Sequence, residues 1–388
     1  PEHSCGGGGT SGDEGGAVRV KKLCALLLTL LLLLGAAEAE PLFEPTQEGI
    51  YNYCPAGFVE DGVTHLYYCT NVNSRVVTDH IGYRRSTDGV HYSEETIVLA
   101  NGKKWDAWDA IHVCDPDVVK GEFKLDGEVY NYLMVYLGCQ TGNNQGNEIG
   151  LAVAKRPEGP FLRVSALNPF VPFTRDLSQK AYYDIFQWGV GQASLVSLDR
   201  KGQILLIYTR GDLTGTRLVC EAWDVNDLNA PRPLGDVWRR EIANRGVIGR
   251  DMRPATLLNA DFAYELTTGR LYMVADGAPC YIEGVDEPGE PTFVSSNLRV
   301  MRYSQSLPPD KMSCFFLNDT AEAWETLALI GRAETSYPRN HNAGLLTDPY
   351  GWIEADAPLQ ILFSVSETKA PNNSLWTYRI HQYAVKIP

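Results

Sequence analysis

Residues 114–119 (CDPDVV) and 130–136 (YNYLMVY) decide the fold of this chain. Both runs are rich in valine, tyrosine and other residues that favour strands, and a segment containing Asp126-Gly127 separates them. The pair therefore predicts two strands joined by a turn. The same pattern recurs four times: residues 54–59 with 65–68, 191–196 with 203–208, 259–264 with 270–274, and 341–346 with 359–365.

Helical periodicity is nearly absent after residue 40, so these repeats predict an all-β protein. Units that recur about five times, at a spacing of roughly 60–80 residues, are typical of a β-propeller with five blades. Alternating runs at 81–89 and 148–161 fit a third strand in the first two units. Packing blades around a ring covers both faces of each blade and leaves only short edges. A β-sandwich with insertions is the alternative.

The first 39 residues do not resemble the rest of the chain. Basic residues at 18–22 precede an apolar run at 23–35, and Ala37-Glu38-Ala39 follows with small residues at both positions that a signal peptidase reads. This order predicts a secretory signal peptide, with upstream sequence before it. The apolar run is shorter than the roughly 20 residues that span a membrane, although a retained anchor is the alternative. We therefore expect a secreted protein with one domain at 40–388, either extracellular or periplasmic.

The charge of the chain is acidic, with 34 basic and 48 acidic residues and a net charge of −14. Nucleic acids and anionic membranes both attract basic surfaces, so neither is an expected partner. A neutral substrate suits an acidic surface better. We also expect a monomer, with no integral membrane segment in the mature chain.

The cysteines allow disulfides but do not fix them. Nine are present, and Cys5 and Cys24 lie in the N-terminal region, which leaves an odd number in the rest. None forms a CxxC pair, which disfavours a zinc ribbon or a redox motif. The predicted hairpins make Cys54 with Cys69, and Cys114 with Cys139, the candidate pairs, while buried free thiols are the alternative.

The second unit carries a resemblance to a known family. Its motifs are Asp115-Pro116-x-Val-Val, a Tyr-x-Met-Val-Tyr run at 132–136, a Gly-x-Ala-x-Ala run at 150–154 and Pro-Glu-Gly-Pro-Phe at 157–161. These motifs resemble glycoside hydrolase family 43 and its invertase and levansucrase relatives. The resemblance implies a five-bladed propeller that cleaves arabinose-, xylose- or related glycosidic bonds in polysaccharides. It implies a carbohydrate substrate and no required cofactor, and an acidic funnel permits a Ca²⁺ on the propeller axis.

The resemblance also implies three carboxylates at the starts of the first three inner strands: a general base, an orienting residue and a general acid. Asp115 occupies the orienting position. Cys54 stands where the base is expected and Gln192 where the acid is expected, so two of the three are missing. Neighbouring carboxylates could replace them, the nearest being Asp109, Asp184 and Asp261. The alignment of the five inner strands places Asp261 at the start of the fourth and His341 at the start of the fifth, so Asp115 and Asp261 are the expected core carboxylates. Alternatively the mechanism is rearranged, or the protein binds sugar without cleaving it.

Other polar and aromatic residues complete the predicted site. The candidate substrate-binding residues are Gln192, Trp188, Trp108, Arg339, His341 and Asn259. His341 also matches a position where related propellers place a histidine beside a bound cation. Each residue has a structural alternative: tryptophans fill the space between blades, a histidine can be a satisfied core residue, and aspartates cap turns.

Overall fold

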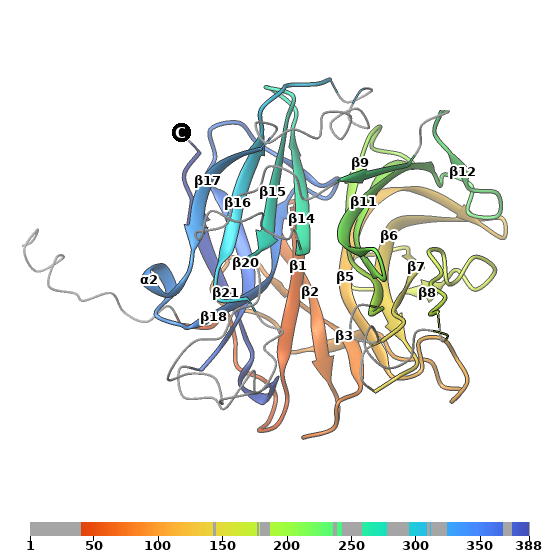
Figure 1. The fold of residues 1–388 in the computed structure, drawn as a ribbon, viewed down its shortest axis with the longest axis horizontal. Coiled ribbons are helices and arrows are strands. Elements are labelled where there is room, and N and C mark those ends of the chain that lie inside the picture. The colour runs from red at the N-terminus through yellow and green to blue at the C-terminus, as the bar shows by residue number, and fades with distance from the viewer. Residues whose placement is uncertain are drawn as a thin grey trace, which may run out of the picture. The chain divides into compact units, whose positions relative to one another are not determined.

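The computed structural model describes residues 40–142, 145–176, 178, 187–235, 239–242, 258–277, 295–308, 311, 324–367 and 375–387. Pro41–Pro388 forms one compact unit (Figure 1). Within the described ranges the regular structure is almost entirely β, with one short α-helix, α2 (Arg332–Thr335), and a 3-10 turn, η5 (Leu375–Thr377). None of the helices described has the length and apolar character needed to cross a membrane. The predicted all-β class is confirmed.

The strands of the described residues form four hydrogen-bonded sheets. The first contains β1 (Asn52–Glu60), β2 (Val63–Asn71), β3 (Asp79–Ser86), β4 (Thr96–Leu99), β18 (Arg339–Thr347), β20 (Leu359–Ser366) and β21 (Arg379–Val385). The second contains β5 (His112–Leu125), β6 (Glu128–Cys139), β7 (Glu148–Ala154) and β8 (Leu162–Arg163). The third contains β9 (Gly189–Ser197), β10 (Gln203–Asp212), β11 (Gly215–Asp224), β12 (Arg232–Pro233) and β13 (Arg239–Ile242). The fourth contains β14 (Leu258–Glu265), β15 (Arg270–Asp276), β16 (Leu298–Tyr303), β17 (Trp324–Ile330) and β19 (Trp352–Ile353).

Five strands, β1, β5, β9, β14 and β18, are the first strands of the five units predicted from the sequence. β1 contacts β5, β5 contacts β9, β9 contacts β14, β14 contacts β18, and β18 returns to β1. The inner strands therefore close a ring. Only four sheets result because β18 pairs with β1 in parallel, at Gly57 with Leu346 and at Phe58 with Thr347.

Each inner strand has a β-bulge near its start. The register shifts fall at residues 54–55, 115–116, 192–193, 259–260 and 342–343. The first bulged residue in each has a positive φ of 45–49°, a conformation that side chains other than Gly, Asn and Asp seldom adopt. The second bulged residue is always proline or alanine. Five equivalent bends therefore turn five equivalent side chains toward the same place.

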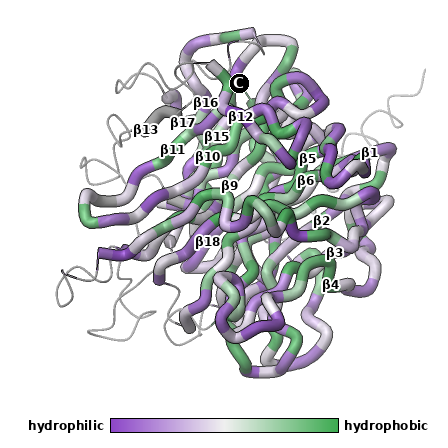
Figure 2. Tube along the Cα trace, turned by 90° about the vertical axis from the view of Figure 1, so that its right-hand side faces the viewer, coloured by the Kyte–Doolittle hydropathy of each residue, from purple (hydrophilic) through white to green (hydrophobic). Residues whose placement is uncertain are grey.

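The core lies between neighbouring sheets. Phe58 of β1 stacks on Tyr132 of β6 with ring centroids 6.0 Å apart, which joins the first sheet to the second. Buried residues of β10 and β14, among them Leu205 and Phe262, pack together in a similar layer between the third and fourth sheets. Figure 2 shows apolar segments along β2, β5 and β6. Each fully buried large apolar side chain contributes about 1.5–3 kcal/mol, so these layers supply the main force that holds the ring together.

The predicted disulfide pairs are wrong. The structure joins Cys69 of β2 to Cys114 of β5, with Cα atoms 5.0 Å apart, and leaves Cys54, Cys139 and Cys220 as free thiols among the described cysteines. The cause is register. Cys69 is the cross-strand partner of Tyr53, because the bulge turns Cys54 away from the β1–β2 hairpin. The bond therefore links two neighbouring hairpins instead of closing one.

Candidate functional site

The five bulges surround one cavity of about 40 Å³ that is partly open to solvent. Its lining consists entirely of bulge residues and their neighbours: Cys54, Pro55, Ala56, Asp115, Pro116, Asp117, Gln192, Ala193, Asn259, Ala260, Asp261, Asn342, Ala343 and Gly344. We call this cavity the bulge pocket. Prolines and alanines give it apolar walls, while thiol, carboxyl and amide groups supply its polar contacts.

The left-handed residues of the bulges define a ring of five equivalent positions. They are Cys54, Asp115, Gln192, Asn259 and Asn342. The first three agree with the alignment made from the sequence. In the fourth and fifth strands the equivalent residues are Asn259 and Asn342, instead of the Asp261 and His341 that the alignment favoured. Asp115 is therefore the single carboxylate in the ring.

Cys54 and Asp115 are the two ring members with raised pKa values, and Asp115 is the one whose pKa lies near neutral. Its side chain is buried, a hydrogen bond links it to Cys54, and the backbone N–H of Gln192 donates to it. Burial raises the pKa of Asp115 to about 6, and the nearby charge of Asp79 adds to the rise, while the hydrogen bonds oppose it. A buried carboxyl group in this range changes charge close to neutral pH.

Two further carboxyl groups, Asp117 and Asp261, line the pocket two residues beyond the ring positions. The N–H of Leu195 donates to Asp117 at 2.6 Å, and the N–H of Leu345 donates to Asp261 at 2.6 Å. Burial raises the pKa of both groups, and the charge of Asp261 raises that of Asp117 further. Each group therefore binds one inner strand to the next, and the pair disfavours a double negative charge.

Asp276 of β15 holds two ring residues, Asn259 and Asn342, in place. Asn259 donates to Oδ2 of Asp276 at 2.7 Å, and the backbone N–H of Asn342 donates to Oδ1 at 2.9 Å. Nδ1 of His341 lies 2.6 Å from the same Oδ2. His341 is therefore a neighbour of Asp276 and is absent from the pocket lining. Its predicted roles in substrate and cation binding stay predictions.

Known proteins match this chain by structure and not by sequence. No protein-family model matches the chain, and no curated protein matches it by sequence. A thermostable family-43 glycoside hydrolase matches with a TM-score of 0.54 and 13% identity, covering 89% of this chain and 94% of that one. The α-L-arabinofuranosidase of Lactobacillus brevis matches with a TM-score of 0.53 and 8% identity, over 89% and 92% of the two chains. The family-62 α-L-arabinofuranosidase domain of Coprinopsis cinerea gives 0.50 and 11%, over 89% and 95%.

This chain has the fold of these glycoside hydrolases. The matched structures are propeller enzymes, so the resemblance predicted from the second unit is confirmed at the level of the fold. Identities this low say nothing about activity. The bulge pocket lies at the starts of the inner strands. The sequence resemblance predicted the catalytic carboxylates at these same positions.

The other predicted carboxylates do not join this pocket within the described residues. Asp109 is buried, with its Oδ2 2.7 Å from Nε of Arg163, and it accepts a hydrogen bond from Tyr136. That ion pair gives Asp109 a structural role outside the pocket lining. Asp184 lies outside the residues that the structure describes.

The predicted aromatic and cationic contacts are also placed away from the lining. Trp108 covers Gly138 of β6, and Trp188 covers Gly211 of β10, so closely that a Cβ on either glycine would overlap the indole. Arg339 is 1% exposed. Trp105, by contrast, is 87% exposed in the loop before β5 and offers a free ring face. Gln192 keeps a buried Oε1 without a hydrogen-bond partner.

The sequence analysis did not predict four of the residues at or beside this site: Asn342, Asp117, Cys69 and Cys114. A signal for Asn342 exists: Asn259-Ala260 and Asn342-Ala343 repeat the pattern of Cys54-Pro55, Asp115-Pro116 and Gln192-Ala193, a polar residue followed by proline or alanine. No local signal marks the disulfide, because its two residues belong to different hairpins.

Proposed function

We propose that the bulge pocket binds the end of a pentose-containing glycan and that the chain does not use the three-carboxylate mechanism of family-43 hydrolases. The observation that carries this proposal is the composition of the ring. One of its five positions is a carboxylate, and Cys54 and Gln192 occupy the equivalents of the expected base and acid. A thiol and an amide supply neither function in the usual mechanism.

The chemistry of the pocket suits a neutral sugar. Gln192 presents an unpartnered acceptor, Asp115 presents a carboxyl group, and the asparagines add amide groups, all of which bind hydroxyl groups. The cavity of about 40 Å³ admits hydroxyl groups, so the sugar ring itself would lie across its mouth, against the proline and alanine side chains. The exposed indole of Trp105 adds a stacking surface in the loop that precedes β5. The arabinofuranosidase names of the matched structures suggest arabinose or xylose as the first sugars to test.

Hydrolysis is the second candidate, because Asp115 has properties of a general acid. Its raised pKa, about 6, leaves about half of it protonated at pH 6 and about a tenth at pH 7. Asp261 or Asp117 would then have to act as the base. Both already accept backbone N–H groups from neighbouring strands, which reduces their freedom to activate water.

Several finer features belong to the same proposal. The seven-stranded sheet would comprise two blades joined through β1 and β18, which makes five blades in total. We also propose that the chain is exported and acts as a monomer, as the N-terminal sequence and the acidic charge suggest. A Ca²⁺ on the axis would take its oxygen ligands from the acidic and amide groups around the pocket.

A paired binding and release assay tests the proposal. Arabino- and xylo-oligosaccharides are titrated into the protein, and released reducing sugar is measured on the same samples. Binding without release, in both the wild type and Asp115→Asn, is the expected result. Release by the wild type that Asp115→Asn abolishes would replace the proposal with the second candidate. Neither binding nor release on any glycan would remove both.

A further inference from the structure

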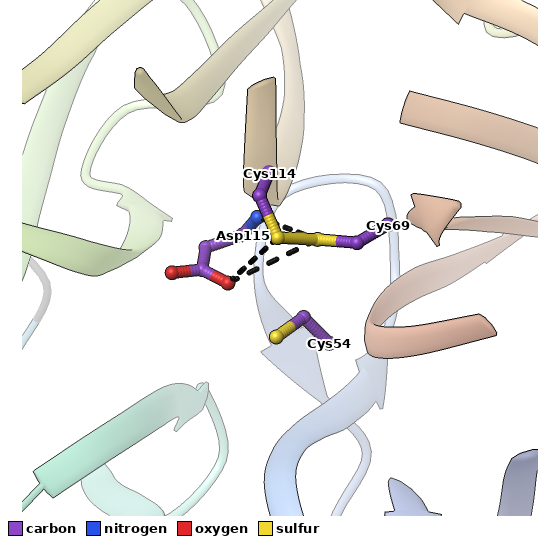
Figure 3. A group of neighbouring side chains, drawn as sticks. All are labelled: Cys54, Cys69, Cys114 and Asp115. Carbon is purple, nitrogen blue, oxygen red and sulfur yellow. Dashed lines mark hydrogen bonds between the residues drawn. A yellow bond between two sulfur atoms is a disulfide. The ribbon is translucent and has the colours of Figure 1, made fainter. Parts of the chain in front are cut away.

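Three cysteines and one carboxylate meet at the edge of the bulge pocket (Figure 3). The sulfur atoms of Cys54, Cys69 and Cys114 and a carboxyl oxygen of Asp115 all lie within 4.8 Å of one another, and all four residues are buried. They come from β1, β2 and β5, three strands that are held in place by the ring. Soft thiolates combined with one carboxylate form a ligand set that favours zinc over magnesium or calcium.

Each sulfur atom also faces a hydrogen-bonding group other than the four side-chain ligand atoms. The side-chain amide of Asn342 donates to Cys54, and the backbone N–H of Asp115 donates to Cys69 at 3.0 Å. Sγ of Cys114 lies 3.1 Å from the hydroxyl oxygen of Tyr53. Groups of this kind stabilise negative charge on sulfur and orient ligands around metals. An inert disulfide beside a buried thiol does not require them.

The hydroxyl of Tyr53, which faces Cys114, is itself held by a second set of buried residues. The hydroxyl of Tyr53 lies 3.4 Å from Oδ2 of Asp79, and the same carboxylate oxygen is 2.5 Å from Nδ1 of His112. Tyr51 also donates to Asp79. The group that faces Cys114 is therefore fixed by a buried network, as the outer layer of a metal site commonly is.

We propose that the cluster is a redox-dependent metal site: when the Cys69–Cys114 disulfide is reduced, Cys54, Cys69, Cys114 and Asp115 bind one thiophilic divalent cation such as Zn²⁺. In the structure the disulfide is closed, so only Cys54 and Asp115 are free to act as ligands. A tetrahedral zinc site has Zn–S bonds of about 2.3 Å, which places its sulfur atoms roughly 3.8 Å apart. The cluster meets this spacing if its ligand atoms move by about 1 Å.

The chemistry balances with a dithiol as the reductant. The dithiol supplies two electrons and two protons, becomes a disulfide itself, and leaves Cys69 and Cys114 as thiols. The cation then displaces the three thiol protons into solvent and takes the carboxylate of Asp115 as its fourth ligand. The oxidised form of such a dithiol reverses the process: it takes two electrons from the two thiolates and two protons from solvent, the Cys69–Cys114 bond closes, Cys54 regains its proton and the cation leaves. This inference does not depend on sugar binding.

Cobalt titration of the full chain tests the proposal. The protein is prepared oxidised and dithiol-reduced, the small thiol is removed without air, and free thiols are counted. Co²⁺ is then added and followed by absorbance, because thiolate-to-cobalt bands report sulfur ligands and intense visible bands report tetrahedral geometry. We expect one Co²⁺ per reduced chain, displaced by Zn²⁺, and no such bands in the oxidised chain.

Two variants locate the site. Cys54→Ser removes one sulfur and is expected to weaken cobalt binding at least tenfold and to reduce the thiolate band by about a third. Cys220→Ser removes a buried free thiol of β11 outside the cluster and is expected to change nothing. Circular dichroism checks that both variants fold. Should Cys54→Ser not fold, the two wild-type states and Asp115→Asn decide the question.

Reduced wild type with open thiols and no cobalt bands would overturn the proposal. So would bands of equal strength in a folded Cys69→Ser/Cys114→Ser variant, because the chain's remaining thiols would then be the ligands.

Discussion

The Cys69–Cys114 disulfide gives the sharpest stability prediction. It closes a loop between residues 45 positions apart. In the loop-entropy treatment such a cross-link removes roughly 13 cal/mol/K from the unfolded chain, or about 4 kcal/mol at 25 °C. Reduction should therefore lower the free energy of unfolding by about 4 kcal/mol, a large part of the 5–15 kcal/mol that is typical of a folded domain.

The assay is guanidinium denaturation of oxidised and reduced protein, followed by tryptophan fluorescence with a chelator present. The chelator prevents metal from stabilising the reduced form. Cys69→Ala/Cys114→Ala should match the reduced wild type to within about 1 kcal/mol and should lose its sensitivity to reductant. Cys220→Ala, the matched control, keeps the full difference between the two conditions. Equal stability of the oxidised and reduced wild type would refute the reasoning, as would a double variant that still responds to reductant.

Two further predictions concern the carboxyl of Asp115 and the packing of Trp188. Burial raises the pKa of Asp115 in the folded protein from 3.8 to about 6. The stability that its protonated form contributes is therefore complete below pH 4 and is lost as the pH rises through 6. The free energy of unfolding of Asp115→Asn should match that of the wild type at pH 4 and exceed it by up to about 3 kcal/mol above pH 7. Urea denaturation of the oxidised proteins at several pH values measures this difference, and a constant offset across pH would contradict it. Gly211→Ala should cost about 1–3 kcal/mol, because the new Cβ would lie 2.0 Å from Nε1 of Trp188, whereas Gly142→Ala, with open space around it, should cost less than 1 kcal/mol in the same thermal assay.

The inner strands could be predicted from the sequence because their information is local. Alternating apolar residues and turn residues mark β5 and β6, although both strands extend beyond the predicted 114–119 and 130–136, to His112–Leu125 and Glu128–Cys139. The ring positions of the first three strands followed from the same alignment. In the fourth and fifth strands the sequence points to Asp261 and His341, because ionisable side chains are the usual catalytic groups. The ring positions are instead Asn259 and Asn342, one or two residues earlier or later.

The remaining features depend on contacts between distant segments. The choice of Cys69 as the partner of Cys114 follows from the bulge in β1 and from the way β2 meets β5, and neither is visible in a single hairpin. Likewise, Asp109 stood close to an inner strand in the sequence, but Arg163, 54 residues away, holds it elsewhere. The carboxylate of Asp261 joins two strands because it accepts the backbone N–H of Leu345, and this contact between distant segments cannot be seen in the sequence.

The most direct test of the account is calorimetric titration of arabino-oligosaccharides into the wild type, Gln192→Ala and Gln203→Ala. Gln192 has an unpartnered acceptor in the bulge pocket, while Gln203 is a half-buried glutamine at the start of β10 outside the lining. Loss of one such hydrogen bond, about 1.5 kcal/mol, predicts affinity reduced roughly tenfold by Gln192→Ala. Gln203→Ala should bind as the wild type does. Equal binding by all three proteins would contradict the account, because the sugar would then lie outside the ring of five bulges.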